Sequence, residues 1–120
     1  MNWYLAKIVY RIICGDGLHT AQFDEQLRLI IAHQEKEALQ KAAAIGKQEE
    51  EVFYNDRKQL VQWKFVDVAE LHTLDNLIDG AELYSQVKET GDPEAYGNFV
   101  HHKAALLREK HTLQTLQTAF

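Results

Sequence analysis

The chain of 120 residues contains one cysteine, one proline and one serine, and each scarcity excludes a class of protein. The lone Cys14 cannot close a disulfide within the chain or build a multi-thiolate zinc or iron–sulfur site. The lone Ser85 has no glycine-rich elbow around it, and the six glycines form no phosphate-binding loop before a helix. The composition is also neither collagenous nor low in complexity. These exclusions leave a folded domain with one modest core.

Long uninterrupted apolar runs are absent as well. Residues 1–15 carry a lysine and an arginine inside their apolar run, so they predict neither a signal peptide nor a membrane span. The formal net charge of −5 argues against nucleic acid as the main partner, because the summed field repels polyanions. We therefore expect a cytoplasmic protein with no membrane contact and no nucleic-acid partner.

Six histidines raise the question of a metal site. Two ligands on one helix face lie three or four residues apart, whereas His101 and His102 are adjacent and His111 is nine or ten residues further along. The acidic stretch 67–94 places too few oxygen ligands at alternating positions for a calcium loop. We predict no metal and no cofactor.

The first part of the chain predicts a β-hairpin. Residues 3–14 alternate with period two. The apolar face of this strand consists of Tyr4, Ala6, Ile8, Tyr10, Ile12 and Cys14. Gly15 and Gly17 supply the positive φ angles of a turn, and a second strand is predicted over 22–33.

The register of this hairpin is expected to bring the two apolar faces together. Leu27, Leu29 and Ile31 share one face of the second strand, and directly paired residues share a side of a sheet. Paired residue numbers should then sum to an odd value of about 35, which places Ile8 opposite Leu27. The other face would collect the polar residues Lys7, Arg11, Asp24, Gln26 and Arg28, with Arg11 opposite Asp24.

The middle of the chain predicts a helix and a second hairpin. Alanine, leucine and isoleucine recur at helical spacing over 35–51, and strands are predicted over 52–54 and 60–68. The apolar positions of the longer strand change parity after Phe65, which indicates either a β-bulge near Phe65 or a strand end buried on both sides. A short last strand is predicted over 81–86.

The whole pattern predicts an α+β fold. An antiparallel sheet of about four strands in the order β-β-α-β-β carries one helix, packed on the face of Tyr4, Ile8, Leu27 and Leu29. Asp92 and Pro93 indicate the start of a long C-terminal helix. Residues 1–90 would form the α+β domain, and 91–120 would be either part of that domain or an oligomer contact.

Several segments also carry a family resemblance. They are Trp3-Tyr4-Leu5-Ala6-Lys7, Phe23-Asp24-Glu25-Gln26-Leu27-Arg28-Leu29-Ile30, Glu37-Ala38 with Gly46 and Glu49-Glu50, Trp63-Lys64-Phe65-Val66, and Asp79-Gly80-Ala81-Glu82-Leu83-Tyr84-Ser85. Over about residues 3–86 the chain resembles the bacterial family named domain of unknown function 4288. The resemblance implies a small stand-alone bacterial protein and brings no activity, cofactor or catalytic residue.

The first functional hypothesis is a non-catalytic interaction or dimerising module, whose partner is a second copy of the chain or another protein. It depends on two apolar surfaces that need a cover. One is a half-apolar sheet face with Trp3, Leu5, Val9 and Ile30, and the other is the apolar stripe of the C-terminal helix.

Two further hypotheses stay open. A small-ligand or anion-binding protein would use Lys7, Arg11 and Arg28 on one basic sheet face, which Lys64 would join if the two hairpins are neighbours, with Trp63 or Trp3 as an apolar wall. An enzyme would use Glu25 or Glu82 as an acid or base if their strands were adjacent. No motif assigns a catalytic residue.

Overall fold

The computed structural model describes residues 1–118 of the chain. The elements are β1 (Asn2–Cys14), β2 (Gln22–Ala32), α1 (Glu35–Gln48), β3 (Glu51–Tyr54), β4 (Leu60–Leu74) and α2 (Pro93–Thr118). Two compact units result: Met1–Ser85 holds the sheet and α1, and a second unit that begins at Gln86 holds α2. Residues 119–120, the end of the predicted C-terminal segment, lie outside the described residues. The predicted α+β fold and the order of its elements are confirmed.

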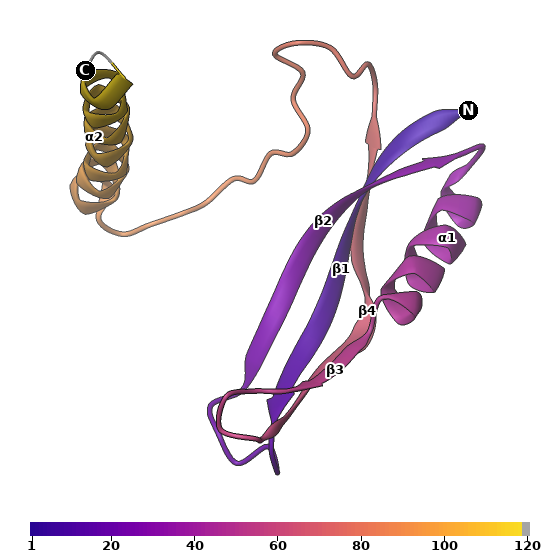
Figure 1. Ribbon diagram of the computed structural model, residues 1–120. Helices are drawn as coiled ribbons and strands as arrows, with labels where there is room; N and C mark the ends of the chain where they lie inside the picture. Colours follow the sequence, from indigo (N-terminus) through magenta and orange to yellow (C-terminus); the bar gives the residue numbers. More distant parts are fainter. Residues whose placement is uncertain (119–120) are drawn as a thin grey trace. The chain divides into compact units, whose positions relative to one another are not determined.

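The strands form one four-stranded antiparallel sheet in the order β2-β1-β4-β3. The long strands curl, and α1 lies along one face of the sheet (Figure 1). That helix contacts β1, β2 and β4. The central strands are therefore β1 and β4, while β2 and β3 are the edge strands.

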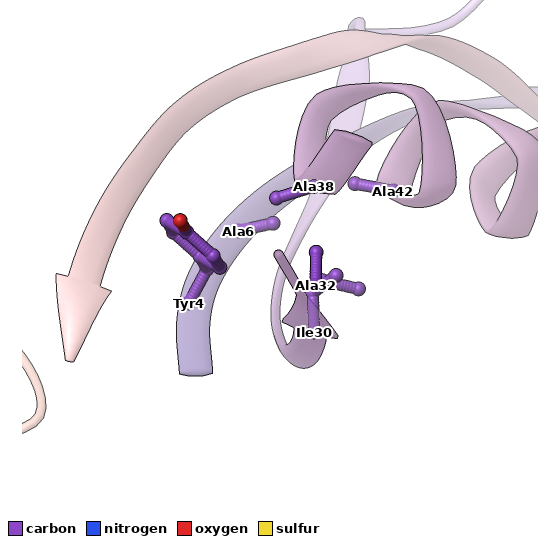
Figure 2. Packing of buried hydrophobic residues seen from close by; sticks show 6 residues of the cluster. All are labelled: Tyr4, Ala6, Ile30, Ala32, Ala38 and Ala42. Carbon is purple, nitrogen blue, oxygen red and sulfur yellow. The ribbon is translucent and has the colours of Figure 1, made fainter. Parts of the chain in front are cut away.

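The core lies between α1 and the sheet. Tyr4 and Ala6 of β1 and Ile30 and Ala32 of β2 pack against Ala38 and Ala42 of α1 (Figure 2). All four alanines are fully buried. Because alanine has a single methyl group, the helix approaches the sheet closely and the core stays thin. Of the apolar residues at helical spacing over 35–51, Ala38 and Ala42 lie on the buried side of α1 as predicted, whereas Leu39 is 44% exposed.

The predicted register of the first hairpin is wrong by one residue. Ile8 lies opposite Gln26, and Lys7 lies opposite Leu27. A shift of one residue moves every side chain of a strand to the other face. Leu27 and Leu29 are consequently half-exposed on the face away from α1, so the predicted packing of the helix on them is also wrong.

The physical reason is that β2 does not bury its more apolar side. Only Ile30 and Ala32 of this edge strand reach the core under α1, so the prediction that Ile30 shares a face with Trp3, Leu5 and Val9 is wrong. Further along the strand, the positions on the helix side are polar: Asp24, Gln26 and Arg28. Matching apolar face to apolar face therefore selected the wrong parity.

The end of α1 is fixed by two aromatic side chains. The Tyr10 hydroxyl donates a 2.8 Å hydrogen bond to the carbonyl of Gly46. The ring of Phe65 packs edge-on against Tyr10, with the centroids 6.1 Å apart, and lies where a side chain at position 46 would project. Burial raises the pKa of the Tyr10 hydroxyl. Gly46 is thus buried and needed for close packing, beyond the weakening of the helix expected from glycine.

Two bulges shape β4. Its register with β1 shifts twice, and Val66 and Ala69 have no partner in β1. The first shift confirms the bulge predicted near Phe65, whereas the second was not predicted. With an extra residue at each bulge, Phe65, Val68 and Leu71 all reach the helix side of the sheet. The strand continues to Leu74, well past the predicted end at residue 68.

The remaining local predictions have mixed outcomes. Gly15 and Gly17 have φ angles of 58° and 81° in the predicted turn. Asp92 accepts a 3.0 Å hydrogen bond from the backbone N–H of Ala95, as expected of an N-cap. The predicted strand over 81–86 is wrong, since this segment has no regular secondary structure.

Candidate functional site

We call the face of the sheet opposite α1 the open face. It carries the odd-numbered residues of β1 and β2, together with the residues of β3 and β4 that lie on the same side. On β2 it exposes Phe23, Leu27 and Leu29 by 55%, 48% and 50%. The register of β3 brings Val52 and Tyr54, 66% and 73% exposed, to the same face. Apolar side chains therefore lie uncovered on both edge strands.

Two rows of opposite charge cross the middle of the open face. In the basic row, Arg11 of β1 lies directly opposite Lys64 of β4. In the neighbouring acidic row, Val9 of β1 lies between Glu25 of β2 and Asp67 of β4. All four charged residues are exposed, and within residues 1–118 none of them forms an ion pair. The face thus carries unpaired charges of both signs side by side.

Residues 75–85, which we call the strap, return over one end of the open face. The ring of Tyr84 lies edge-on to His72, with the centroids 5.3 Å apart. The ammonium group of Lys7 lies 5.7 Å from the centroid of the same Tyr84 ring. Leu5, which is paired with His72, is only 5% exposed. The strap therefore contacts the Lys7 end of the face, whereas the basic and acidic rows remain exposed.

Under the strap, Lys7 is already paired with a carboxylate. Its Nζ lies 2.6 Å from Oε2 of Glu70, and His72 Nε2 lies 3.5 Å from the other carboxylate oxygen. The bond between the two charged groups raises the pKa of Lys7 and lowers the pKa of Glu70. Lys7 is therefore not a free cation for an anionic ligand.

A chain of polar contacts lies on the α1 face. The indole N–H of Trp63 donates to Asp24 (3.0 Å), whose same oxygen accepts from the Gln26 amide (2.7 Å). Arg28 donates to the Gln26 amide oxygen through Nε and Nη2 (3.1 and 2.7 Å). The guanidinium of Arg28 also forms an ion pair with Glu49, which follows the end of α1: Nη2 lies 2.6 Å from Oε2 of Glu49. These contacts connect the edge strand β2 across β1 to β4.

Beside this polar chain is an open hollow of about 500 Å³. It is lined by Tyr10, Gln26, Arg28, Gln48, Glu49, Glu50, Glu51 and Trp63. Glu50 accepts a 2.9 Å bond from the backbone N–H of Phe65, which lowers the pKa of that carboxyl, and Lys47 lies 3.1 Å from it. Most of the charged groups around the hollow are thus bound to the protein itself.

The residues predicted to bind a ligand do not form one site. Lys7 and Arg11 lie on the open face, whereas Arg28 and Trp63 lie on the α1 face. The predicted collection of Lys7, Arg11 and Arg28 on one face is wrong, because it depended on the hairpin register. Lys64 does lie beside Arg11, as expected for neighbouring hairpins. Ligand binding by these residues stays a prediction.

Phe23, Val52 and Tyr54 were not predicted to lie on the surface, although all three are exposed. Phe23 has the same parity on its strand as Leu27 and Leu29, which were predicted to be buried, so the sequence pattern did not indicate its exposure. The condition for pairing Glu25 with Glu82 is not met, since Glu82 belongs to the strap and not to a strand.

Within residues 1–118, no three side chains of histidine, cysteine, aspartate or glutamate are grouped in a way that can hold a metal ion. In the same part of the chain, no helix combines the length and the apolar character needed to cross a membrane.

The family resemblance is borne out by comparison with known proteins. The family model described as "Domain of unknown function (DUF4288)" matches residues 3–85. No curated protein and no solved structure matches the chain. The matched residues include all four strands, α1 and the strap, and so contain both faces of the sheet. The chain therefore belongs to the DUF4288 family of domains of unknown function.

Proposed function

We propose that this domain is a non-catalytic protein-interaction module whose contact surface is the open face of the sheet. The observation that carries the proposal is the exposure of Phe23, Leu27 and Leu29 on β2 and of Val52 and Tyr54 on β3. Exposed apolar side chains that gather on one face of a sheet are typical of association sites. Association is proposed in place of turnover because no sequence motif assigns a nucleophile or a phosphate loop.

The energetics indicate what such a contact requires. Complete burial of a leucine or phenylalanine side chain stabilises by about 1.5 to 3 kcal/mol. Phe23, Leu27 and Leu29 are each about half-exposed, so covering the rest gains about 1 kcal/mol per side chain. Lost translational and rotational freedom costs at least about 4 kcal/mol on association. The partner must therefore cover more of the face than these three residues, and the charged rows lie beside them.

The hollow on the α1 face is a weaker candidate for a binding site. Asp24 is bonded to Trp63 and Gln26, and Arg28 is bonded to Gln26 and Glu49. A ligand would have to replace these contacts, whereas a partner on the open face displaces water from apolar side chains and from charged side chains that form no ion pair within residues 1–118. This difference favours the open face.

Site-specific photo-crosslinking tests the proposal. A benzoyl-phenylalanine is placed at Leu29, on the open face, and in a matched sample at Leu39, which is 44% exposed on α1. We expect a discrete crosslinked protein from position 29 in the expressing cell, and none from position 39. The crosslink should disappear when Leu27 is also changed to aspartate. Equal crosslinking from both positions, or none from position 29, would contradict the proposal.

A further inference from the structure

We infer that the occupant of the open face is a second copy of this chain, packed face to face across a two-fold axis between the basic and acidic rows. The inference rests on the proposed function, because it names the partner of the same surface. The basic row consists of Arg11 and Lys64, and the acidic row consists of Glu25 and Asp67. The order of these charges along the strands favours a second copy over other partners.

The rows are neighbours along the strands. Arg11 and Val9 are separated by one residue of β1, so the rows are about 7 Å apart. The four charges sum to zero, so the patch does not share the repulsion that the net charge of −5 gives the whole chain. A partner with charge of one sign would neutralise one row and leave the other unpaired. The best partner presents both signs in adjacent rows.

The open face itself presents that pattern under two-fold symmetry. With the axis across the strands and between the rows, rotation places each basic row opposite the acidic row of the other copy. Lys64 then faces Asp67 of the second copy, and Arg11 lies between Glu25 and Asp67 of the second copy. Because the contact is isologous, every pair occurs twice. Two sheets packed in this way are about 10 Å apart, which long charged side chains can span.

The surroundings of the rows fit the same arrangement. Phe23 is the β2 neighbour of Arg11, and Leu27 follows Glu25 on the same face of β2. These apolar side chains flank the charge pairs and would keep water from them, as the rim of an interface does. The strap contacts Lys7 and His72, beyond the acidic row, and leaves the four charged residues exposed. The strap therefore does not cover the surface that a second copy needs.

Charge reversal tests the inference. Arg11→Glu places a carboxylate between Glu25 and Asp67 of the second copy, and Glu25→Arg places a cation beside Arg11 of the second copy, so each change puts like charges in contact. Both residues are exposed, so folding should be retained. Native mass spectrometry and sedimentation velocity on the full chain should show a wild-type dimer of twice 13.9 kDa. Each reversal alone should raise the dissociation constant by about tenfold or more.

The decisive sample is the mixture of the two variants. Arg11→Glu and Glu25→Arg should form a heterodimer more tightly than either forms a homodimer, because position 11 of each variant then meets an opposite charge at position 25 of the other. Lys36→Glu, an exposed reversal on α1, is the matched control and should leave the dimer unchanged.

The outcomes separate the two proposals. A wild-type dimer that both reversals leave unchanged, or a mixture with no preference for the heterodimer, would overturn the inference. A wild-type monomer that still gives the Leu29-specific crosslink to a different protein would overturn the inference and leave the proposed function standing. A monomer with no crosslink would overturn both.

Discussion

Replacing Gly46 by alanine tests the packing that fixes the end of α1. In an exposed helix this change stabilises by about 1 kcal/mol, because alanine favours the helix. Here the added methyl carbon would lie 2.6 Å from Cδ2 of Phe65 and 3.2 Å from Cγ2 of Ile8. Overpacking of a core costs about 1 to 3 kcal/mol. The Phe65 ring is held edge-on against Tyr10, so we expect the upper part of that range and a net destabilisation of about 1 to 2 kcal/mol.

Urea unfolding followed by tryptophan fluorescence measures the effect as a lower midpoint with an unchanged slope. In a Phe65→Leu background the methyl group has more room, so Gly46→Ala should cost less there than in the wild type. Ala44→Gly, exposed on the same helix, is the control for helix propensity alone and should cost about 1 kcal/mol. A Gly46→Ala variant as stable as the wild type would refute the close approach of α1 to Phe65.

Two other predictions concern polar contacts. Asp24→Ala removes the acceptor of Trp63 and Gln26, so the free energy of unfolding should fall by about 1 to 3 kcal/mol in a urea titration; an unchanged midpoint would count against the polar chain. The bond from Lys7 lowers the pKa of Glu70 from its ordinary 4.5, so this carboxylate contributes stability above pH 4.5 that is lost as the pH falls through the lowered pKa. Glu70→Gln should flatten the stability profile below about pH 5, and a slope there equal to the wild type would contradict the assignment.

Much of the fold follows from local signals in the sequence. Alternation in β1, the glycines of the first turn, the alanine spacing of α1 and the Asp92 cap each act within a few residues, and the structure contains all of them. The first bulge in β4 could be predicted in the same way, because the apolar pattern changes parity at one point after Phe65.

The hairpin register needed information that alternation does not contain. The helix side of β2 ends in the polar residues of the Asp24 chain, while its more apolar side is left on the open face. Parity matching assumes that the more apolar face is buried, and that assumption fails on this edge strand, whose more apolar side is exposed. The prediction that Arg28 lies on the same face as Lys7 and Arg11 was wrong for the same reason, since Arg28 lies on the α1 face and pairs with Glu49.

The role of Gly46 in packing against Phe65 could not be predicted from the neighbouring sequence either. Within α1 a glycine predicts only a weaker helix. The approach of Phe65 comes from β4, a distant part of the chain, and depends on the register between β1 and β4. Contacts of this kind are set by tertiary packing and carry no signature in the helix sequence.

Hydroxyl-radical footprinting across an about hundredfold range of protein concentration tests the central claim most directly, because mass action fills a self-association surface as concentration rises. Phe23 and Leu29 report on the open face, and Leu39 reports on α1. Phe23 and Leu29 should lose reactivity toward the radical as the protein concentration increases, while the reactivity of Leu39 should stay constant. Constant reactivity of Phe23 and Leu29, or a loss confined to Leu39, would contradict it.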